Sequence, residues 1–174
     1  MKRLFTAILL LVVLIISGCA TNMPMKTVDQ VDLDKFMGDW YVIASIPTMF
    51  EKNIANAIER YDRIGPRKIQ TTFTYFKQND PERHQMNPVG YVKDDPSNAL
   101  WGMQFIWPIK ADYRIIYLDD DYQTTIIGRE KRDYVWIMAR QPAIPEPLYD
   151  DLVKFIESVG YDTTELKKVP QNWD

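Results

Sequence analysis

Short β-rich runs, some apolar throughout and others alternating between apolar and polar residues, make up most of this chain. Eight runs follow one another, at 40–46, 57–64, 69–76, 88–93, 98–106, 113–118, 124–128 and 134–140. Turn-forming residues separate them, as at Gly65-Pro66 and Asp94-Asp95-Pro96. Alternation with a period near two, interrupted at short and regular spacing, is typical of an antiparallel sandwich or barrel rather than of βαβ units.

The periodicity becomes helical after the last of these runs. Apolar residues recur every three or four positions at Leu148, Leu152, Phe155, Ile156 and Val159. Pro145 and Pro147 suit the first turn of a helix, and Gly160 suits the position just after its end. We therefore predict one amphipathic helix whose apolar stripe packs on the sheet.

The run at 134–140 favours a barrel over a sandwich, because both of its faces are apolar. Tyr134, Trp136 and Met138 share one face, and Val135, Ile137 and Ala139 share the other. One face can line an interior while the other receives the helix. The prediction is an all-β fold: an eight-stranded antiparallel up-and-down barrel with one C-terminal helix packed on the outside.

The N-terminus has the pattern of a secretory signal. Lys2 and Arg3 precede an apolar run at 4–16 that is too short to span a bilayer, which takes about 20 residues. The run closes on Ser17-Gly18-Cys19, which resembles the lipobox of bacterial lipoproteins. That resemblance implies a signal peptide at 1–18, an acylated Cys19, a lipidated flexible tether at 19–30 and a domain at 31–174. An uncleaved anchor with an incidental cysteine is the alternative.

Composition excludes several functional classes. The net charge is −3 and no basic block occurs, so we expect no nucleic-acid partner. With one histidine and one cysteine in the chain, we expect no zinc site, no haem and no other cofactor. Residues 119–121 are acidic, but the positions after them lack the oxygen ligands of a calcium loop, so no metal site is predicted.

Three motifs resemble those of the lipocalin family, and they occur in the family's order. Gly38-Asp39-Trp40 resembles its G-x-W signature, the hairpin with Asp121 and Tyr122 its second motif, and the run ending at Arg140 its third. Asp120 departs from the family's threonine. The resemblance implies that Arg140 lies across Trp40 and donates to backbone carbonyls, so Gly38, Trp40, Asp121, Tyr122 and Arg140 are expected to be structural.

Together with the lipobox, the chain is most similar to the bacterial lipocalins, which are outer-membrane lipoproteins related to apolipoprotein D. This similarity implies binding or transport of a small hydrophobic ligand, either a fatty acid or a lysophospholipid. Ala20 is not the aspartate associated with inner-membrane retention, so the implied location is the periplasmic face of the outer membrane, reached through the lipid anchor. A homodimer is left open.

Strand parity gives the candidate residues of a ligand cavity. They are Phe73, Tyr75, Trp101, Met103, Phe105, Tyr113, Ile115, Tyr117, Tyr134, Trp136 and Met138. The same side chains could instead fill a solid core. Glu59 and Arg60 are either an ion pair in the interior or a pair at the rim or surface.

No catalytic residue is assigned, and we expect a protein that is not an enzyme. His84 lies in a polar stretch, and Ser97 does not stand in a G-x-S-x-G elbow. Two alternatives remain at this point. One is a lipid esterase or isomerase on a barrel scaffold, and the other is a filled barrel with a structural or interaction role in the envelope.

Overall fold

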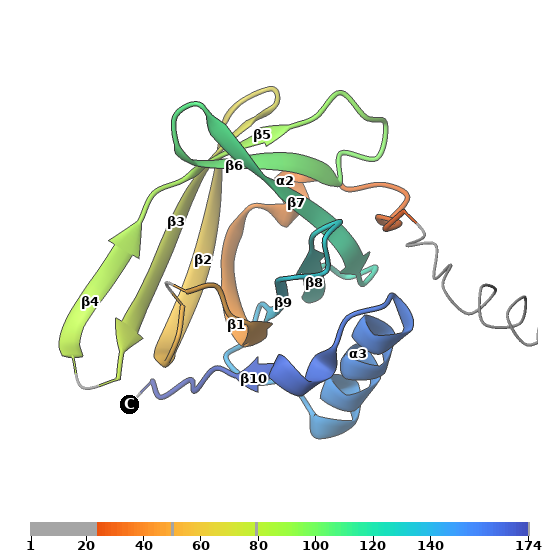
Figure 1. The fold of residues 1–174 in the computed structure, drawn as a ribbon. Coiled ribbons are helices and arrows are strands. Elements are labelled where there is room, and N and C mark those ends of the chain that lie inside the picture. The colour runs from red at the N-terminus through yellow and green to blue at the C-terminus, as the bar shows by residue number, and fades with distance from the viewer. Residues whose placement is uncertain (1–23, 50, 79, 174) are drawn as a thin grey trace, which may run out of the picture.

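The computed structural model describes residues 24–49, 51–78 and 80–173, and nearly all of its regular structure is strand (Figure 1). The strands are β1 (Gly38–Ile46), β2 (Ile54–Gly65), β3 (Lys68–Lys77), β4 (Asp80–Met86), β5 (Val89–Val92), β6 (Leu100–Ile106), β7 (Ile109–Leu118), β8 (Thr124–Gly128), β9 (Val135–Ala139) and β10 (Lys167–Lys168). The helices are α2 (Leu33–Phe36), α3 (Glu146–Ser158) and the 3-10 turn η1 (Thr163–Glu165).

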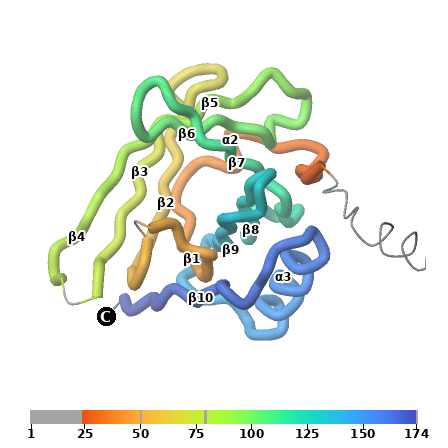
Figure 2. Tube along the Cα trace, viewed as in Figure 1, coloured from red at the N-terminus to blue at the C-terminus, as the bar shows by residue number. Residues whose placement is uncertain are grey.

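The strands close into a barrel. Neighbours pair antiparallel in the order β10-β1-β2-β3-β5-β6-β7-β8-β9, and β1 also pairs with β9. β4 and β5 pair with the two ends of β3, so together they form one interrupted strand of the barrel. Figure 2 shows β1 beside β9 and β10, where the ring closes through the register from Tyr41↔Ala139 to Ile46↔Val135. The predicted eight-stranded antiparallel barrel is confirmed.

β9 separates two cores, as its two apolar faces predicted. Met138 belongs to the cluster inside the barrel, and Trp136 packs against that cluster. Ile137 belongs to a second cluster between the barrel wall and α3, where Leu152 and Ile156 of the helix are buried. The outer position of the helix is therefore confirmed.

The ends of α3 follow the sequence signals. Proline occupies its first turn, and Gly160 adopts a φ of +94° just beyond its last turn. That left-handed conformation carries no steric penalty in glycine. Beyond the helix, the two-residue strand β10 pairs with β1.

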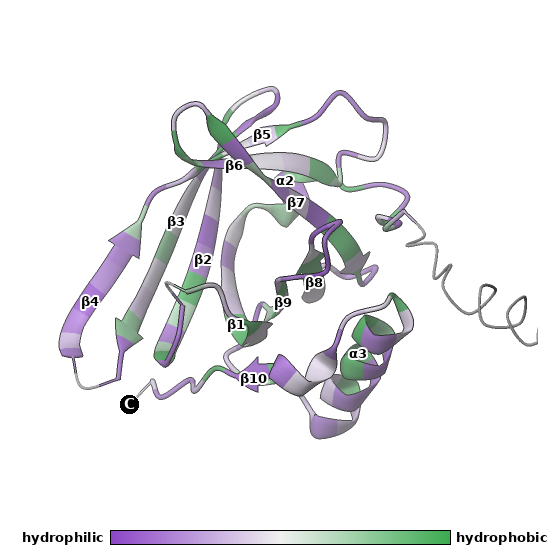
Figure 3. Ribbon diagram, in the orientation of Figure 1, coloured by the Kyte–Doolittle hydropathy of each residue, from purple (hydrophilic) through white to green (hydrophobic). Residues whose placement is uncertain are grey.

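Three elements differ from the predictions. β4 is not among the predicted runs, because it is mostly hydrophilic and lacks the alternation of its neighbours (Figure 3). β7 begins at Ile109, earlier than the run predicted at 113–118. The single turn α2 was not predicted; Asp32 caps it by accepting from the amides of Asp34 and Lys35.

The segment before the barrel is not a free tether along its whole length. Met25 is 5% exposed, and the amides of Val28 and Val31 donate to the carbonyls of Ile115 and Ser97. The segment predicted as a tether at 19–30 therefore packs on the barrel from Met25 onward. Cys19 and the predicted signal peptide lie outside the described residues. Within the part of the chain that the structure describes, no helix is long and apolar enough to cross a membrane.

Candidate functional site

One end of the barrel is closed by Arg140. Its guanidinium carbon lies 3.8 Å from the centroid of the Trp40 ring. Its nitrogens donate to the carbonyls of Lys35, Phe36, Met37, Asp39 and Tyr122 at 2.8–3.3 Å. Burial lowers the pKa of Arg140 from its usual value, although the group stays charged at any physiological pH. One planar cation thus joins α2, β1 and the β7–β8 hairpin.

Aromatic rings fill the barrel behind this closure. Phe36, Trp40, Tyr61 and Trp101 are each fully buried, with ring centroids 5.1–5.7 Å apart in the contacting pairs. The indole of Trp40 donates to the carbonyl of Phe36 at 2.9 Å. This end of the barrel is therefore a packed core rather than a cavity.

The other motif residues lie around the same closure. Gly38 has a φ of +95°, and a Cβ there would come 3.3 Å from Nη1 of Arg140. The hydroxyl of Tyr122 accepts from the amide of Asp32 at 2.8 Å, which ties the β7–β8 hairpin to the N-cap of α2. Asp121 is exposed, and only its carbonyl takes part, by accepting from the Gln123 side chain.

A cavity of about 610 Å³ occupies the opposite half of the barrel. Its lining is Thr48, Met49, Glu51, Glu59, Phe73, Met86, Asn87, Pro88, Met103, Phe105, Ile106, Ala111, Asp112, Tyr113, Arg129, Tyr134 and Trp136. Met49, Phe105 and Ile106 are 74%, 57% and 72% exposed, so the cavity reaches the surface between the β1–β2 loop and the tip of the β6–β7 hairpin. The volume falls within the roughly 300–1,000 Å³ that is usual for small-molecule sites.

Six of the residues that were expected from strand parity line this cavity. They are Phe73, Met103, Phe105, Tyr113, Tyr134 and Trp136. Five others do not. Trp101, Ile115 and Met138 belong to the packed interior cluster, and Tyr75 lies within it with its ring stacked on His84.

Tyr117 is the clearest departure among those five. It lies on the outer face of the barrel, where its ring packs against Phe155 of α3 at 5.6 Å between centroids. The register between β7 and β8 shifts between Ile115 and Tyr117. A bulge of this kind moves the following side chain to the other face of the sheet, and a parity rule counted from Tyr113 cannot detect it.

Two acidic side chains, Glu51 and Glu59, are prominent in the lining; the sequence reasoning missed Glu51 and considered Glu59 only as a partner of Arg60. Glu59 points into the cavity, whereas Arg60 points outward and pairs with Asp39 and Asp62. The two are therefore neither an interior pair nor a surface pair. The signal was available, because adjacent residues of one strand face opposite sides.

Burial dominates the electrostatics of these two carboxyls. Loss of solvation raises the pKa of Glu59 to about 8; a hydrogen bond with Tyr61 opposes the shift, and the nearby Glu51 adds to it. Glu59 keeps some accessible surface because it faces the cavity, yet protein surrounds it. Burial also raises the pKa of Glu51, although the amide of Thr48 and the indole of Trp136 donate to its Oε2 at 3.2 Å and 3.1 Å.

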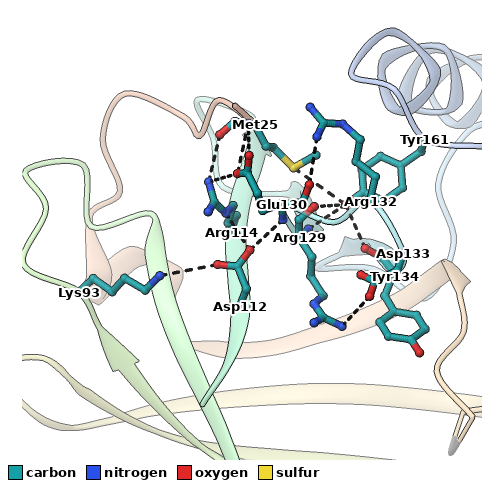
Figure 4. A network of polar contacts seen from close by, with 10 residues as sticks. All are labelled: Met25, Lys93, Asp112, Arg114, Arg129, Glu130, Arg132, Asp133, Tyr134 and Tyr161. Carbon is teal, nitrogen blue, oxygen red and sulfur yellow. Dashed lines mark hydrogen bonds and ion pairs between the residues drawn. The ribbon is translucent and has the colours of Figure 1, made fainter. Parts of the chain in front are cut away.

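A polar network supports the wall at Asp112 and Arg129 (Figure 4). Asp112 accepts from Nε of Arg114 and from the amide of Glu130, and Nη1 of Arg114 lies 2.6 Å from Oε2 of Glu130. These contacts bring the pKa of Asp112 below its usual value although burial opposes the change. The Glu130 carboxylate also accepts from the amide of Met25 at 3.3 Å. The network thus holds the N-terminal segment beside the cavity wall.

The groups considered for catalysis are engaged elsewhere. Nε2 of His84 lies 2.8 Å from Oδ2 of Asp80. The hydroxyl of Ser97 bonds to Asp95, and Ser97 lies near the closed end, where its carbonyl receives the amide of Val31. The described hydrogen bonds link neither side chain to the other.

Sequence and structure comparisons agree with this architecture. The model of the lipocalin-like domain family matches residues 31–171. Temperature-induced lipocalin-1 of Arabidopsis thaliana is 30% identical over 85% of this chain and 83% of its own length. The outer membrane lipoprotein Blc of Citrobacter freundii is 24% identical over 90% of both chains.

Solved structures show the same fold at lower identity. Insecticyanin from the tobacco hornworm Manduca sexta matches with a TM-score of 0.68 and 15% identity, over 87% of this chain and 86% of that chain. The siderocalin Ex-FABP matches with a TM-score of 0.63 and 11% identity, over 80% of this chain and 96% of that chain. With a closed barrel, an Arg140–Trp40 closure and a family match over nearly the whole described chain, this protein belongs to the lipocalin family.

Proposed function

We propose that this protein is a lipid-anchored carrier that holds a single-chain amphiphile, a fatty acid or a lysophospholipid, in the cavity of its barrel at the bacterial outer membrane. Family membership supports the binding of a small hydrophobic ligand. The cavity of about 610 Å³ carries the proposal, because a filled barrel would leave no room for an acyl chain.

The cavity wall suits hydrocarbon. Phe73, Met103 and Trp136 offer large apolar surfaces inside, and Phe105 and Ile106 continue the apolar surface outward at the rim. Burying a long acyl chain yields about 0.8 kcal/mol for each methylene, so a sixteen-carbon chain gives on the order of 10 kcal/mol before ordering costs. After those costs, micromolar or tighter binding is expected.

Displaceable binding of a fluorescent acyl probe tests the carrier role. Delipidated protein is titrated with the probe, and an unlabelled acyl chain is then added as competitor. Saturable binding that the competitor reverses is expected. A folded barrel that shows no displaceable binding would remove the proposed function.

The lipobox and the similarity to outer-membrane lipoproteins support the anchor at Cys19. Cys19→Ser should move the protein from the membrane fraction to the soluble periplasmic fraction. Its melting temperature should stay unchanged, because the packed domain begins at Met25. Fractionation identical to the wild type would contradict acylation at this cysteine.

A further inference from the structure

The excess of carboxyls inside the cavity points to a ligand that carries a positive charge. Glu51, Glu59 and Asp112 line it, against Arg129 as the single cation among its described lining residues. Asp112 is already balanced by Arg114 and Lys93. Glu51 and Glu59 form no ion pair with any described residue, so two carboxyls remain without a cation in an apolar chamber.

The neighbours of Glu59 along the sheet are aromatic, and no cation among the described residues pairs with it. Its register partners are Trp40 on β1 and Phe73 on β3, and Tyr61 follows it on the same face of β2. From β7, the hydroxyl of Tyr113 bonds to that of Tyr61. Glu51, from the loop after β1, also acts on Glu59, and its charge raises the pKa of Glu59 further.

Arg129 does not neutralise these carboxyls. Its Nη1 lies 3.3 Å from Oδ2 of Asp133, and its guanidinium lies 5.1 Å from the centre of the Tyr134 ring. Its Nε is buried and has no hydrogen-bond partner among the described residues. Nη1 thus pairs with the β8–β9 loop, on the side of the cavity that the network of Figure 4 supports, whereas Nε has no described partner.

We infer that the cavity selects an amphiphile with a cationic head group, whose nitrogen lies between Glu51 and Glu59 and against the rings of Phe73, Tyr113 and Trp136. This inference rests on the proposed function and narrows its ligand. Alkyl amines, alkyl ammonium compounds and the ethanolamine or choline end of a lysophospholipid have this chemistry. A carboxylate head gains no such pairing, and it is repelled once Glu59 ionises; below about pH 8 Glu59 holds its proton and this repulsion weakens. Aromatic faces together with carboxyls are a favourable setting for an ammonium group.

Cation binding is also coupled to proton release. A cation beside Glu59 favours its ionised form, so a ligand that binds below about pH 8 must displace the proton held there. The affinity of a quaternary ammonium ligand should therefore rise with pH up to about 8. A quaternary nitrogen does not titrate, so any such dependence reports on the protein.

Three dodecyl ligands that differ only in head-group charge test the inference. They are dodecyltrimethylammonium, dodecanol and dodecanoate, each used to displace the uncharged dye N-phenyl-1-naphthylamine. The protein is the full-length chain carrying Cys19→Ser, so that no attached acyl group competes. We expect the cation to bind about tenfold or more tighter than the anion, with the alcohol between them.

Variants locate the preference within the cavity. Glu59→Gln and Glu51→Gln should each reduce the cation-to-anion ratio by about threefold or more and leave the alcohol unchanged. Glu165→Gln, which removes an exposed carboxylate of η1 outside the barrel, is the matched control and should change nothing. The pH dependence of the wild type gives a second readout that does not require any variant to fold.

The outcomes separate the two proposals. If dodecanoate binds as well as the cation, or better, and the glutamate variants leave the ratio unchanged, the head-group inference is wrong while the carrier role stands. Loss of dodecanoate binding in Arg129→Gln would then assign the head group to Arg129 instead. If none of the three ligands displaces the dye from folded protein, the carrier role fails and the inference fails with it.

Discussion

The two ends of the barrel are built on opposite principles. At the closed end, Arg140 satisfies five backbone carbonyls and covers a ring, and the aromatic side chains behind it are fully buried. At the open end, Glu51 and Glu59 line an apolar cavity and form no ion pair with any described residue, and Met49 and Phe105 are exposed at the rim.

The contrast teaches that folding and binding are assigned to different halves of one barrel. Polar groups at the closed end are satisfied by the chain itself, so they stabilise the folded state. The carboxyls at the open end carry a cost of desolvation that the folded protein alone does not offset, which is a usual property of binding sites. Stability measurements should therefore respond in opposite directions to changes at the two ends.

Arg140→Ala should produce the largest loss of stability. It removes the stacking on Trp40 and leaves several partly buried carbonyls without a donor, so the free energy of unfolding should fall by about 4 kcal/mol. Urea unfolding measures this. Arg60→Ala is the matched control: its exposed ion pairs with Asp39 and Asp62 should contribute about 0.5 kcal/mol or less. Equal effects of the two variants would mean that Arg140 does not close the barrel.

Glu59→Gln should act in the opposite direction, with an effect that grows as the pH rises above about 4.5. Folded Glu59 keeps its proton up to about pH 8, whereas the unfolded chain releases it near the ordinary value of 4.5. The unfolded state therefore binds fewer protons between these values, and wild-type stability falls as pH rises through that window. At pH 9 the variant should be more stable by on the order of 3 kcal/mol, and at pH 4 the two should be nearly equal. Parallel stability–pH curves would refute the raised pKa.

A larger side chain should destabilise the packed half of the barrel more than the hollow half. Ala99 is fully buried near the closed end, so Ala99→Phe should overpack the core and cost about 2 kcal/mol. Ala111 lines the cavity, so Ala111→Phe should cost less than about 1 kcal/mol and should instead weaken binding of the naphthylamine dye. Thermal unfolding and dye titration of both variants measure these effects. Similar destabilisation by both would show that the open half has no spare volume.

The smallest effect is expected at the rim. Trp107 is 81% exposed at the tip of the β6–β7 hairpin, so Trp107→Ala should change the free energy of unfolding by about 0.5 kcal/mol or less. Equilibrium unfolding in urea measures it against Ala99→Phe as the closed-end reference. A loss above about 1 kcal/mol would show that the hairpin tip contributes to folding as well as to the cavity rim.

Sequence periodicity predicted the barrel because its determinants are local. The two apolar faces of β9 and the stripe of α3 are visible in the order of the residues alone. β4 was not predicted as a strand, because its residues are mostly exposed and polar and show no alternation. Tyr117 was misplaced by a bulge, which depends on pairing with β8 and leaves no trace in the composition of β7.

The cavity was only partly predictable for a different physical reason. Parity separates inward from outward side chains, but it says nothing about depth along the barrel axis. Trp101 and Met103 share a face of β6, yet one is packed at the closed end and the other lines the cavity. Glu59 could have been placed inside from its position next to Arg60. Its raised pKa could not, because that depends on groups from separate elements, above all the burial that the whole barrel provides.

With the proposed acyl anchor at Cys19, the buried Met25 would limit how far the barrel can move from a membrane. Met25 is fixed by Glu130, whose neighbour Arg129 lines the cavity, and Cys19 stands six positions earlier in the chain. A fully extended residue spans at most about 3.6 Å, so an acyl anchor at Cys19 would keep Met25 within about 20 Å of the lipid surface. A carrier held by so short a link would rotate about its anchor but would not move far from the membrane surface. Its exchange of cargo would then take place with the leaflet directly beneath it.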